Sequence, residues 1–138
     1  GERLDALHLL ADGRLLVSTV ASFTVPGVSG LDEDLTAFTP TSLGATTAGT
    51  WAMYLDGSAV GLADNSEDTD AVSVAANGDI YLSTLGNFSV TGVSGQNDDV
   101  FVCAPTSTGP ITSCTFSSFF DGAAVGLGGD NVDAIDLP

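Results

Sequence analysis

The chain has almost no positive charge. Its 138 residues include no lysine, two arginines and one histidine, against 18 aspartates and glutamates, so the formal net charge at pH 7 is −16. A field of this sign repels phosphate groups, which disfavours binding to nucleic acid and to anionic membrane surfaces. The same field attracts cations, Ca²⁺ above all, or a basic partner.

Long apolar runs and helical periodicity are lacking as well. No uninterrupted apolar stretch approaches the ~20 residues that a membrane-spanning helix needs, so we expect no membrane insertion. No segment repeats apolar residues at helical spacing, and Gly, Thr, Ser and Pro interrupt the chain throughout. Because 43% of the residues are nonetheless hydrophobic, the composition predicts a packed all-β domain with an acidic surface rather than a disordered acidic tail.

The most informative feature that is present is a duplication. The segment from Asp5 to Leu62 recurs as Asp70 to Leu127 at an offset of 65 residues, with 25 of 58 positions identical. A third copy begins at Val132-Asp133-Ala134-Ile135-Asp136-Leu137. Self-similarity at a fixed period is typical of repeat architectures. We therefore divide the chain into a first β repeat (1–66), a second β repeat (67–129) and the start of a third (130–138).

Each repeat is predicted to form four short antiparallel strands. The pairs Asp12-Gly13 and Asn77-Gly78 stand between apolar runs, which is a strong hairpin signal. A loop from Pro26 to Glu33 separates the second and third strands of the first repeat, and Asp56-Gly57 turns the chain toward the next one. The expected strands are Leu4 to Leu10, Arg14 to Val20, Asp34 to Thr39 and Thr50 to Leu55 in the first repeat, and Thr69 to Ala75, Asp79 to Leu85, Asp99 to Ala104 and Thr115 to Phe120 in the second.

Four antiparallel strands in tandem are typical of β-propeller blades, and a two-sheet β-sandwich is the alternative. Two blades cannot close a ring, since propellers typically need about four to eight. The chain is therefore part of a longer propeller, a subunit of a ring of several chains, or a unit of an open head-to-tail filament. In each case a C-terminal extra strand can complete a neighbouring copy by strand addition, through Val132, Ala134, Ile135 and Leu137.

Several phrases of the chain carry a resemblance to known repeats. They include Asp12-Gly13-Arg14-Leu15-Leu16, Phe23-Thr24-Val25-Pro26-Gly27-Val28-Ser29-Gly30 and Tyr54-Leu55-Asp56-Gly57. These phrases resemble tandem, β-propeller-like repeats of large secreted or surface proteins of bacteria, and the segment from Ala71 to Val90 resembles the first hairpin of the blades in sugar-lactonase-like propellers. The resemblance implies an extracellular or cell-surface setting and adds no catalytic residue.

The acidic residues gather at two kinds of position. One cluster stands at the entrance to the first strand of a repeat, and the other follows a Gly-Val-Ser-Gly loop that is identical in both repeats. Carboxylates that converge beside Gly-rich turns suit Ca²⁺, which takes oxygen ligands. The candidate calcium ligands are Asp32, Asp34, Asp68, Asp70, Asp98, Asp99, Asp130 and Asp133. The alternative is a purely structural role, because Asp at turns commonly caps backbone N–H groups and neither cluster has EF-hand spacing.

The two cysteines occur in the second repeat only. Cys103 and Cys114 stand where the first repeat has Phe38 and Gly49, and they flank one predicted hairpin loop. This placement favours a disulfide between neighbouring strands, and with it an oxidising, extracellular compartment. The alternative is a pair of free thiols.

Groups for catalysis are scarce. His8 is the only histidine, and its place in the middle of a strand favours a half-buried structural role. No nucleophile-elbow motif is present, and one histidine with two cysteines is too few for a zinc site. We therefore expect no enzymatic activity.

The sequence favours a non-enzymatic, extracellular structural module, such as a repeat of a surface filament or an adhesin. Copies would associate head to tail, with calcium as a stabilising ion. The alternative is a lectin-like, carbohydrate-binding propeller assembled from several chains, in which glycans stack on aromatics such as Trp51. A fragment of a lactonase-like enzyme is a third interpretation.

Overall fold

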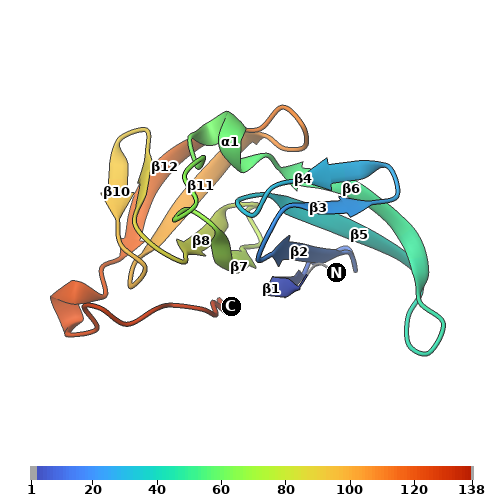
Figure 1. The fold of residues 1–138 in the computed structure, drawn as a ribbon, viewed down its shortest axis with the longest axis horizontal. Helices are drawn as coiled ribbons and strands as arrows, with labels where there is room; N and C mark the ends of the chain where they lie inside the picture. Colours follow the sequence, from blue (N-terminus) through green and yellow to red (C-terminus); the bar gives the residue numbers. More distant parts are fainter. Residues whose placement is uncertain (1–2, 138) are drawn as a thin grey trace.

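The computed structural model describes residues 3–137, which form an almost entirely β structure (Figure 1). Each repeat forms one four-stranded antiparallel sheet, with the orders β1-β2-β5-β6 and β7-β8-β11-β12. The strands are β1 (Leu4–Leu9), β2 (Leu15–Thr19), β5 (Leu35–Ser42) and β6 (Ala48–Leu55), and then β7 (Thr69–Val74), β8 (Ile80–Thr84), β11 (Val100–Ser107) and β12 (Ser113–Phe120). The predicted all-β fold of two tandem four-stranded repeats is therefore confirmed, and over residues 3–137 the sheets close into neither a barrel nor a ring.

The outer hairpin of each sheet is longer than the sequence predicted. Strands β5 and β6 continue past Thr39 into an arm rich in Thr and Ser. Pro40, which cannot donate to a ladder, pairs with Gly49 next to a register shift. Irregular positions of this kind tolerate proline, so the ladder continues beyond it.

Each sheet also carries a small hairpin that the sequence did not predict. Strand β3 (Phe23–Val25) pairs with β4 (Val28–Gly30), and β9 (Phe88–Val90) pairs with β10 (Val93–Gly95). The predicted loop from Pro26 to Glu33 is therefore wrong at Val28–Gly30, because three-residue strands are too short to show alternation. A Cβ on Gly30 would lie 2.6 Å from the ring of Phe23, and the second repeat has the same close approach. Packing thus explains why both repeats keep the Gly-Val-Ser-Gly loop.

A short helical turn follows each sheet and leads the chain onward. Helix α1 (Gly57–Val60) follows the first sheet, and the 3₁₀ turn η1 (Ala123–Val125) follows the second. Asp56 caps α1 by accepting the N–H of Ala59 at 3.0 Å. The sequence predicted only a turn here, because a four-residue helix is too short to show a periodicity.

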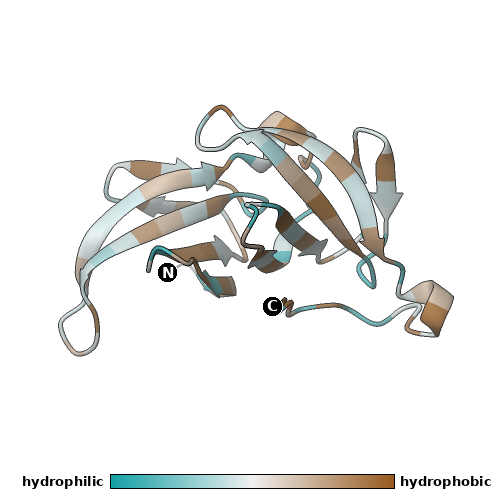
Figure 2. Ribbon diagram, turned by 180° about the vertical axis from the view of Figure 1, so that it is seen from behind, coloured by the Kyte–Doolittle hydropathy of each residue, from teal (hydrophilic) through white to brown (hydrophobic). Residues whose placement is uncertain are grey.

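The two faces of each sheet differ in what they contact. Figure 2 shows hydrophobic and polar residues alternating along the long strands, as expected for strands that present two faces. We call one face of each sheet its forward face; in the first repeat it carries His8, Leu16, Ala37, Ala52 and Tyr54, and in the second Ser73, Tyr81, Val102, Ser117 and Phe119. The opposite, rear face carries Leu7, Leu15, Phe38 and Trp51 in the first repeat, and Val72, Ile80, Cys103 and Phe116 in the second.

The forward face of the first repeat packs against the rear face of the second. Strand β1 lies against β7 at the inner end of the interface. One continuous core joins residues of both faces, and it includes Leu16, Ala37, Val72, Ile80 and Cys103. The two repeats therefore share one hydrophobic core, and neither sheet buries its apolar residues alone.

The expected C-terminal extra strand is not formed as a strand. Residues 130–137 have no ladder pairing, and they return beneath the second sheet toward β1 and β7 (Figure 1). Ala134 and Ile135 lie near Ala71 and Val72 at the inner end of the interface. Pro138 lies outside the described residues.

Candidate functional site

The junction between successive repeats is the feature that the chain builds twice. At the first junction the N–H of Thr69 donates to the carbonyl of Asp32 at 3.3 Å, and at the second the N–H of Val132 donates to the carbonyl of Asn97 at 2.9 Å. These four residues occupy equivalent positions in the repeats. Residues 132–137 therefore lie where the first strand of a third repeat belongs, although they lack its ladder.

The connector between sheet and junction is also repeated. The N–H of Leu62 donates to the carbonyl of Gly57 at 3.0 Å, and the N–H of Leu127 donates to the carbonyl of Gly122 at 2.9 Å. Glu67 holds the first connector in place, because its carboxylate accepts backbone N–H groups from residues 63, 64 and 89. The path from one repeat to the next is thus fixed by main-chain hydrogen bonds rather than by a flexible linker.

Asp34 and Asp99 brace this connector in both repeats. Asp34 accepts the N–H of Leu31 and the N–H of Gly57, each at 2.8 Å. Asp99 accepts the equivalent N–H groups of Gln96 at 2.9 Å and Gly122 at 3.1 Å. Both oxygens of each carboxylate are therefore engaged, which gives the identity of these two residues a structural explanation.

Five carboxyl groups lie near one another at the first junction: Asp5, Asp32, Glu33, Asp68 and Asp70. Burial, and after it the neighbouring carboxylates with Asp5 first, raise the pKa of Asp68 to about 7. Burial likewise raises the pKa of Glu33 to about 7 and that of Asp70 to about 6. One buried oxygen of each of these three side chains has no hydrogen-bond partner. We call all five carboxyl groups together the junction carboxylates.

The second junction replaces two of these acids by amides. Asn97 stands where the first junction has Asp32, and Asn131 stands where it has Asp68. The amide of Asn131 donates to the carboxylate of Asp70 at 2.8 Å. Asp98, the counterpart of Glu33, is fully buried and neither of its oxygens has a partner.

The structure thus places the eight predicted calcium ligands at separate points. Asp32, Asp68 and Asp70 come together at the first junction, and Asp133 lies beside this group, near Asp70 and in the same depression as Asp5. Asp98 and Asp130 belong to the second junction. Among residues 3–137, no three His, Cys, Asp or Glu side chains are arranged as a ready-made metal site. Calcium binding at these residues remains a prediction. Asp5 and Glu33 were missing from the predicted set, because their approach to Asp68 depends on how the repeats pack.

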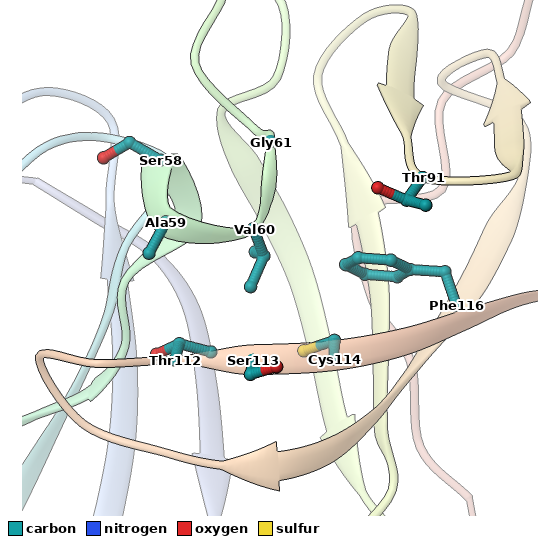
Figure 3. Close-up of a pocket in the computed structure, with 9 residues that line it drawn as sticks. All are labelled: Ser58, Ala59, Val60, Gly61, Thr91, Thr112, Ser113, Cys114 and Phe116. Atoms are coloured by element: carbon teal, nitrogen blue, oxygen red, sulfur yellow. The ribbon is translucent and has the colours of Figure 1, made fainter.

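An open depression lies beside the first connector, between α1 and β12 (Figure 3). It has a volume of about 460 Å³, and Val60 and Phe116 point toward each other across it. The hydroxyl group of Thr112 donates to the carbonyl of Gly109 and accepts the N–H of Asp56. The lining residues include serine and threonine hydroxyl groups but no acid, base or free thiol, so no lining side chain would activate these hydroxyl groups as nucleophiles.

A larger, more apolar groove of about 540 Å³ lies on the rear face of the first repeat. The rings of Phe38 and Trp51 meet at its base with centroids 4.7 Å apart, and Leu7 lies beside them. In the second repeat the equivalent surface is buried in the shared core. The groove is therefore the rear surface that a preceding repeat would cover, and no segment of the described chain covers it.

The predicted disulfide is present. Cys103 and Cys114 are joined across β11 and β12. In the first repeat the ring of Phe38 fills the equivalent space over Gly49, where a Cβ would lie 2.5 Å from the ring. The two repeats thus fill one position in two ways, and the one with the disulfide lies inside the shared core.

His8 lies half-buried in β1, at the interface between the repeats. Its Nε2 accepts the N–H of Val74 at 3.3 Å, and burial lowers the pKa of the imidazole. Both effects favour a neutral ring that links the two sheets, in agreement with the structural role predicted from the sequence.

Comparisons with known proteins give no match, so the function is inferred from the geometry of the structure. No helix within residues 3–137 has the length and apolar character needed to cross a membrane. A scan against protein-family models finds no match, and neither the search of curated proteins nor that of solved structures gives one.

Proposed function

We propose that this protein is a non-enzymatic structural module whose repeats stack head to tail, the forward face of one repeat against the rear face of the next. The repeated junction carries the proposal, since the hydrogen bond from Val132 to Asn97 reproduces the one from Thr69 to Asp32. In repeat proteins each unit contacts only its neighbours, so a junction made once can be made again.

The two ends of the molecule are complementary. On the rear face, Leu7 is 57% exposed, whereas its equivalent Val72 is 3% exposed. On the forward end, the ring of Phe119 is exposed where its equivalent Tyr54 packs against the core. Each end thus exposes a large apolar side chain whose equivalent at the first junction is covered. A head-to-tail contact of this type does not close on itself unless its rotation makes a ring.

The partner that fits the rear groove best is a second copy of the chain. Large exposed apolar surfaces mark interaction sites, and this groove is the surface that the second repeat buries in the shared core. A copy that docks its forward face there recreates an interface of known shape. The net charge of −16 opposes the approach of two copies, so we expect association to strengthen at higher salt.

Residues 132–137 supply the mechanism of the contact. They occupy the place of a following first strand but pair with no strand of their own chain. Strand addition to an exposed sheet edge satisfies main-chain groups of this kind. In the described chain residues 132–137 lie beside β1 and β7, at the place that the first strand of a docked copy needs. We expect Val132, Ala134, Ile135 and Leu137 to leave that place and to pair with the inner edge of the docked copy's first sheet, where β1 has a ladder partner on one side only.

An extracellular setting is part of the proposal. The disulfide supports it, because such bonds persist in oxidising compartments and are rare in reducing ones.

The test is the oligomeric state in solution, measured by sedimentation velocity at raised ionic strength and by negative-stain microscopy. We expect association that grows with concentration and yields short rods or rings. Leu7→Asp places a charge on the exposed rear face, and Val125→Asp places one on the exposed forward end. Each variant should weaken association about tenfold or more, because a buried unpaired charge costs well over 1.4 kcal/mol.

Leu31→Asp is the matched control, since Leu31 is an exposed leucine in a loop outside both faces. A wild-type chain that stays monomeric under all these conditions would contradict the proposal. Removal of residues 132–137 tests the strand mechanism separately. We expect this deletion to abolish association; unchanged association would mean that copies contact each other through the two sheet faces only.

A further inference from the structure

The two junctions differ by two exchanges of an acid for an amide, and the exchange of Asp68 for Asn131 changes a side-chain hydrogen bond. At the second junction the amide of Asn131 donates to the carboxylate of Asp70. In the repeat alignment Asp68 replaces Asn131, and Asp5 replaces Asp70. At the first junction the positions of this amide donor and carboxylate acceptor are therefore both held by carboxyl groups, and Asp5 is the strongest charged influence on Asp68.

The surroundings of this pair offer little compensation. Asp68 is only 3% exposed, and its Oδ1 has no partner, as is also true of one oxygen on Asp70 and one on Glu33. Arg3 is the one cation that favours the charged form of Asp5, and burial outweighs its effect on that carboxyl group. Buried carboxylates without partners are costly, so positive charge is missing from this point of the structure.

We propose that a divalent cation, with Ca²⁺ as the best candidate, binds at the first junction between the carboxylates of Asp5 and Asp68. The cation takes the place that the amide hydrogen of Asn131 has at the second junction. Calcium accepts six to eight oxygen ligands, which are carboxylates, backbone carbonyls and waters together. A site with two carboxylates agrees with the finding that, over residues 3–137, no three acidic side chains form a closed set.

The bound ion acts on the contact within the chain. Asp5 belongs to β1 in the first repeat, and Asp68 stands at the entrance to β7 in the second. A cation shared by them joins the inner ends of the two sheets where β1 lies against β7. The ion therefore fixes the angle between the repeats, and this inference does not depend on association between copies.

The experiment measures calcium binding by isothermal titration at pH 7.5 on dilute protein, together with thermal unfolding in calcium and in chelator. We expect one bound ion per chain and a higher melting temperature with calcium, because a ligand that binds only the folded state stabilises it. Asp68→Asn gives the first junction the residue of the second. It should weaken calcium binding by about tenfold or more, since ligand charge sets the affinity of calcium sites.

The same variant should melt higher than the wild type in chelator, because its amide can donate to Asp5 as Asn131 donates to Asp70. Asp64→Asn is the matched control: it removes one exposed acid outside the cluster and should leave calcium binding unchanged. Equal loss in both variants would reduce the effect to general screening and overturn the proposal.

A second result would also overturn it. If calcium changes nothing while the stability of the wild type falls as pH rises from 3.8, the ordinary pKa of an aspartate, to about 7, the pKa of Asp68 in the fold, the missing charge is a proton and not a metal ion. The direction follows from the raised pKa: such a carboxyl group contributes fully below its unfolded-state pKa, and the contribution is gone once pH has risen through the folded-state pKa.

Discussion

The first and second repeats are two copies of one unit in two different environments. Leu62 is fully buried after the first sheet, whereas its equivalent Leu127 is 40% exposed after the second. Val60 and Val125 differ in the same direction, at 9% and 66% exposed. Both copies keep the same apolar residue, yet only the junction that has a following repeat buries it. The proposed stacking of copies would cover the exposed apolar residues of the second connector in the same way.

Truncation of this leucine in each repeat should separate the two environments most strongly. Leu62→Ala removes a fully buried side chain and should lower the free energy of unfolding by about 2–5 kcal/mol. Leu127→Ala should cost less than about 1 kcal/mol in the monomer, because solvent already reaches this side chain. Chemical denaturation of both variants at low concentration measures the difference.

Leu127→Ala should nevertheless weaken association, since the same side chain becomes buried when a further repeat follows. Equal destabilisation by the two substitutions in the monomer would mean that the second connector is covered by the chain itself. The comparison between the repeats would then lose its basis.

The features that sequence reasoning recovers are those within one repeat. The strand pairs on either side of Asp12-Gly13 and Asn77-Gly78 follow from local turn chemistry and alternation. The β3–β4 hairpin is missed because three residues do not make a pattern. Asp68 and Asp70, two of the candidate calcium ligands, are both buried at the junction.

What sequence reasoning misses depends on contacts between repeats. The approach of Asp5 and Glu33 to Asp68 joins three segments that are far apart in the chain. No local sequence pattern predicts that these three segments come close together. A signal was present all the same, because the aligned repeats hold Arg3, Asp68 and Asn131 at one position, so its charge differs in each copy.

The disulfide gives a second, smaller contrast between the repeats. Replacing both Cys103 and Cys114 by alanine should lower the free energy of unfolding by about 2–3 kcal/mol, the range expected for a loop of this length. The same register holds in the first repeat, where Phe38 and Gly49 occupy the equivalent positions. Phe38→Cys combined with Gly49→Cys should therefore oxidise to a second disulfide.

Mass spectrometry under non-reducing conditions detects that bond, and urea denaturation with and without reductant measures both effects. A double cysteine variant that stays reduced in air would show that the two outer hairpins differ in geometry. The ring of Phe38 over Gly49 and the disulfide would then not be interchangeable ways of filling the same position.

The smallest difference lies at the first turn of each repeat, which is stabilised by an ion pair in the first repeat and by a side-chain amide hydrogen bond in the second. Arg14 forms an ion pair with Asp12 at 2.8 Å and lies over the ring of Tyr54. In the second repeat the amide of Asn77 donates to Asp79 at 2.7 Å instead. In both turns the first residue also accepts the backbone N–H two positions on, at 3.1 Å.

Because the backbone bond is common to both turns, the side-chain bond above it should contribute little. Asp12→Asn combined with Arg14→Asp places the second turn in the first repeat, and it should change the free energy of unfolding by less than about 1 kcal/mol, as expected for an exposed ion pair. Denaturation at low and high salt checks this, since only the wild-type turn depends on an ion pair that salt screens. A decrease of several kcal/mol in the free energy of unfolding would instead show that Arg14 helps to hold the two sheets together through Tyr54. The first turn would then stabilise the junction between the repeats and not only its own repeat.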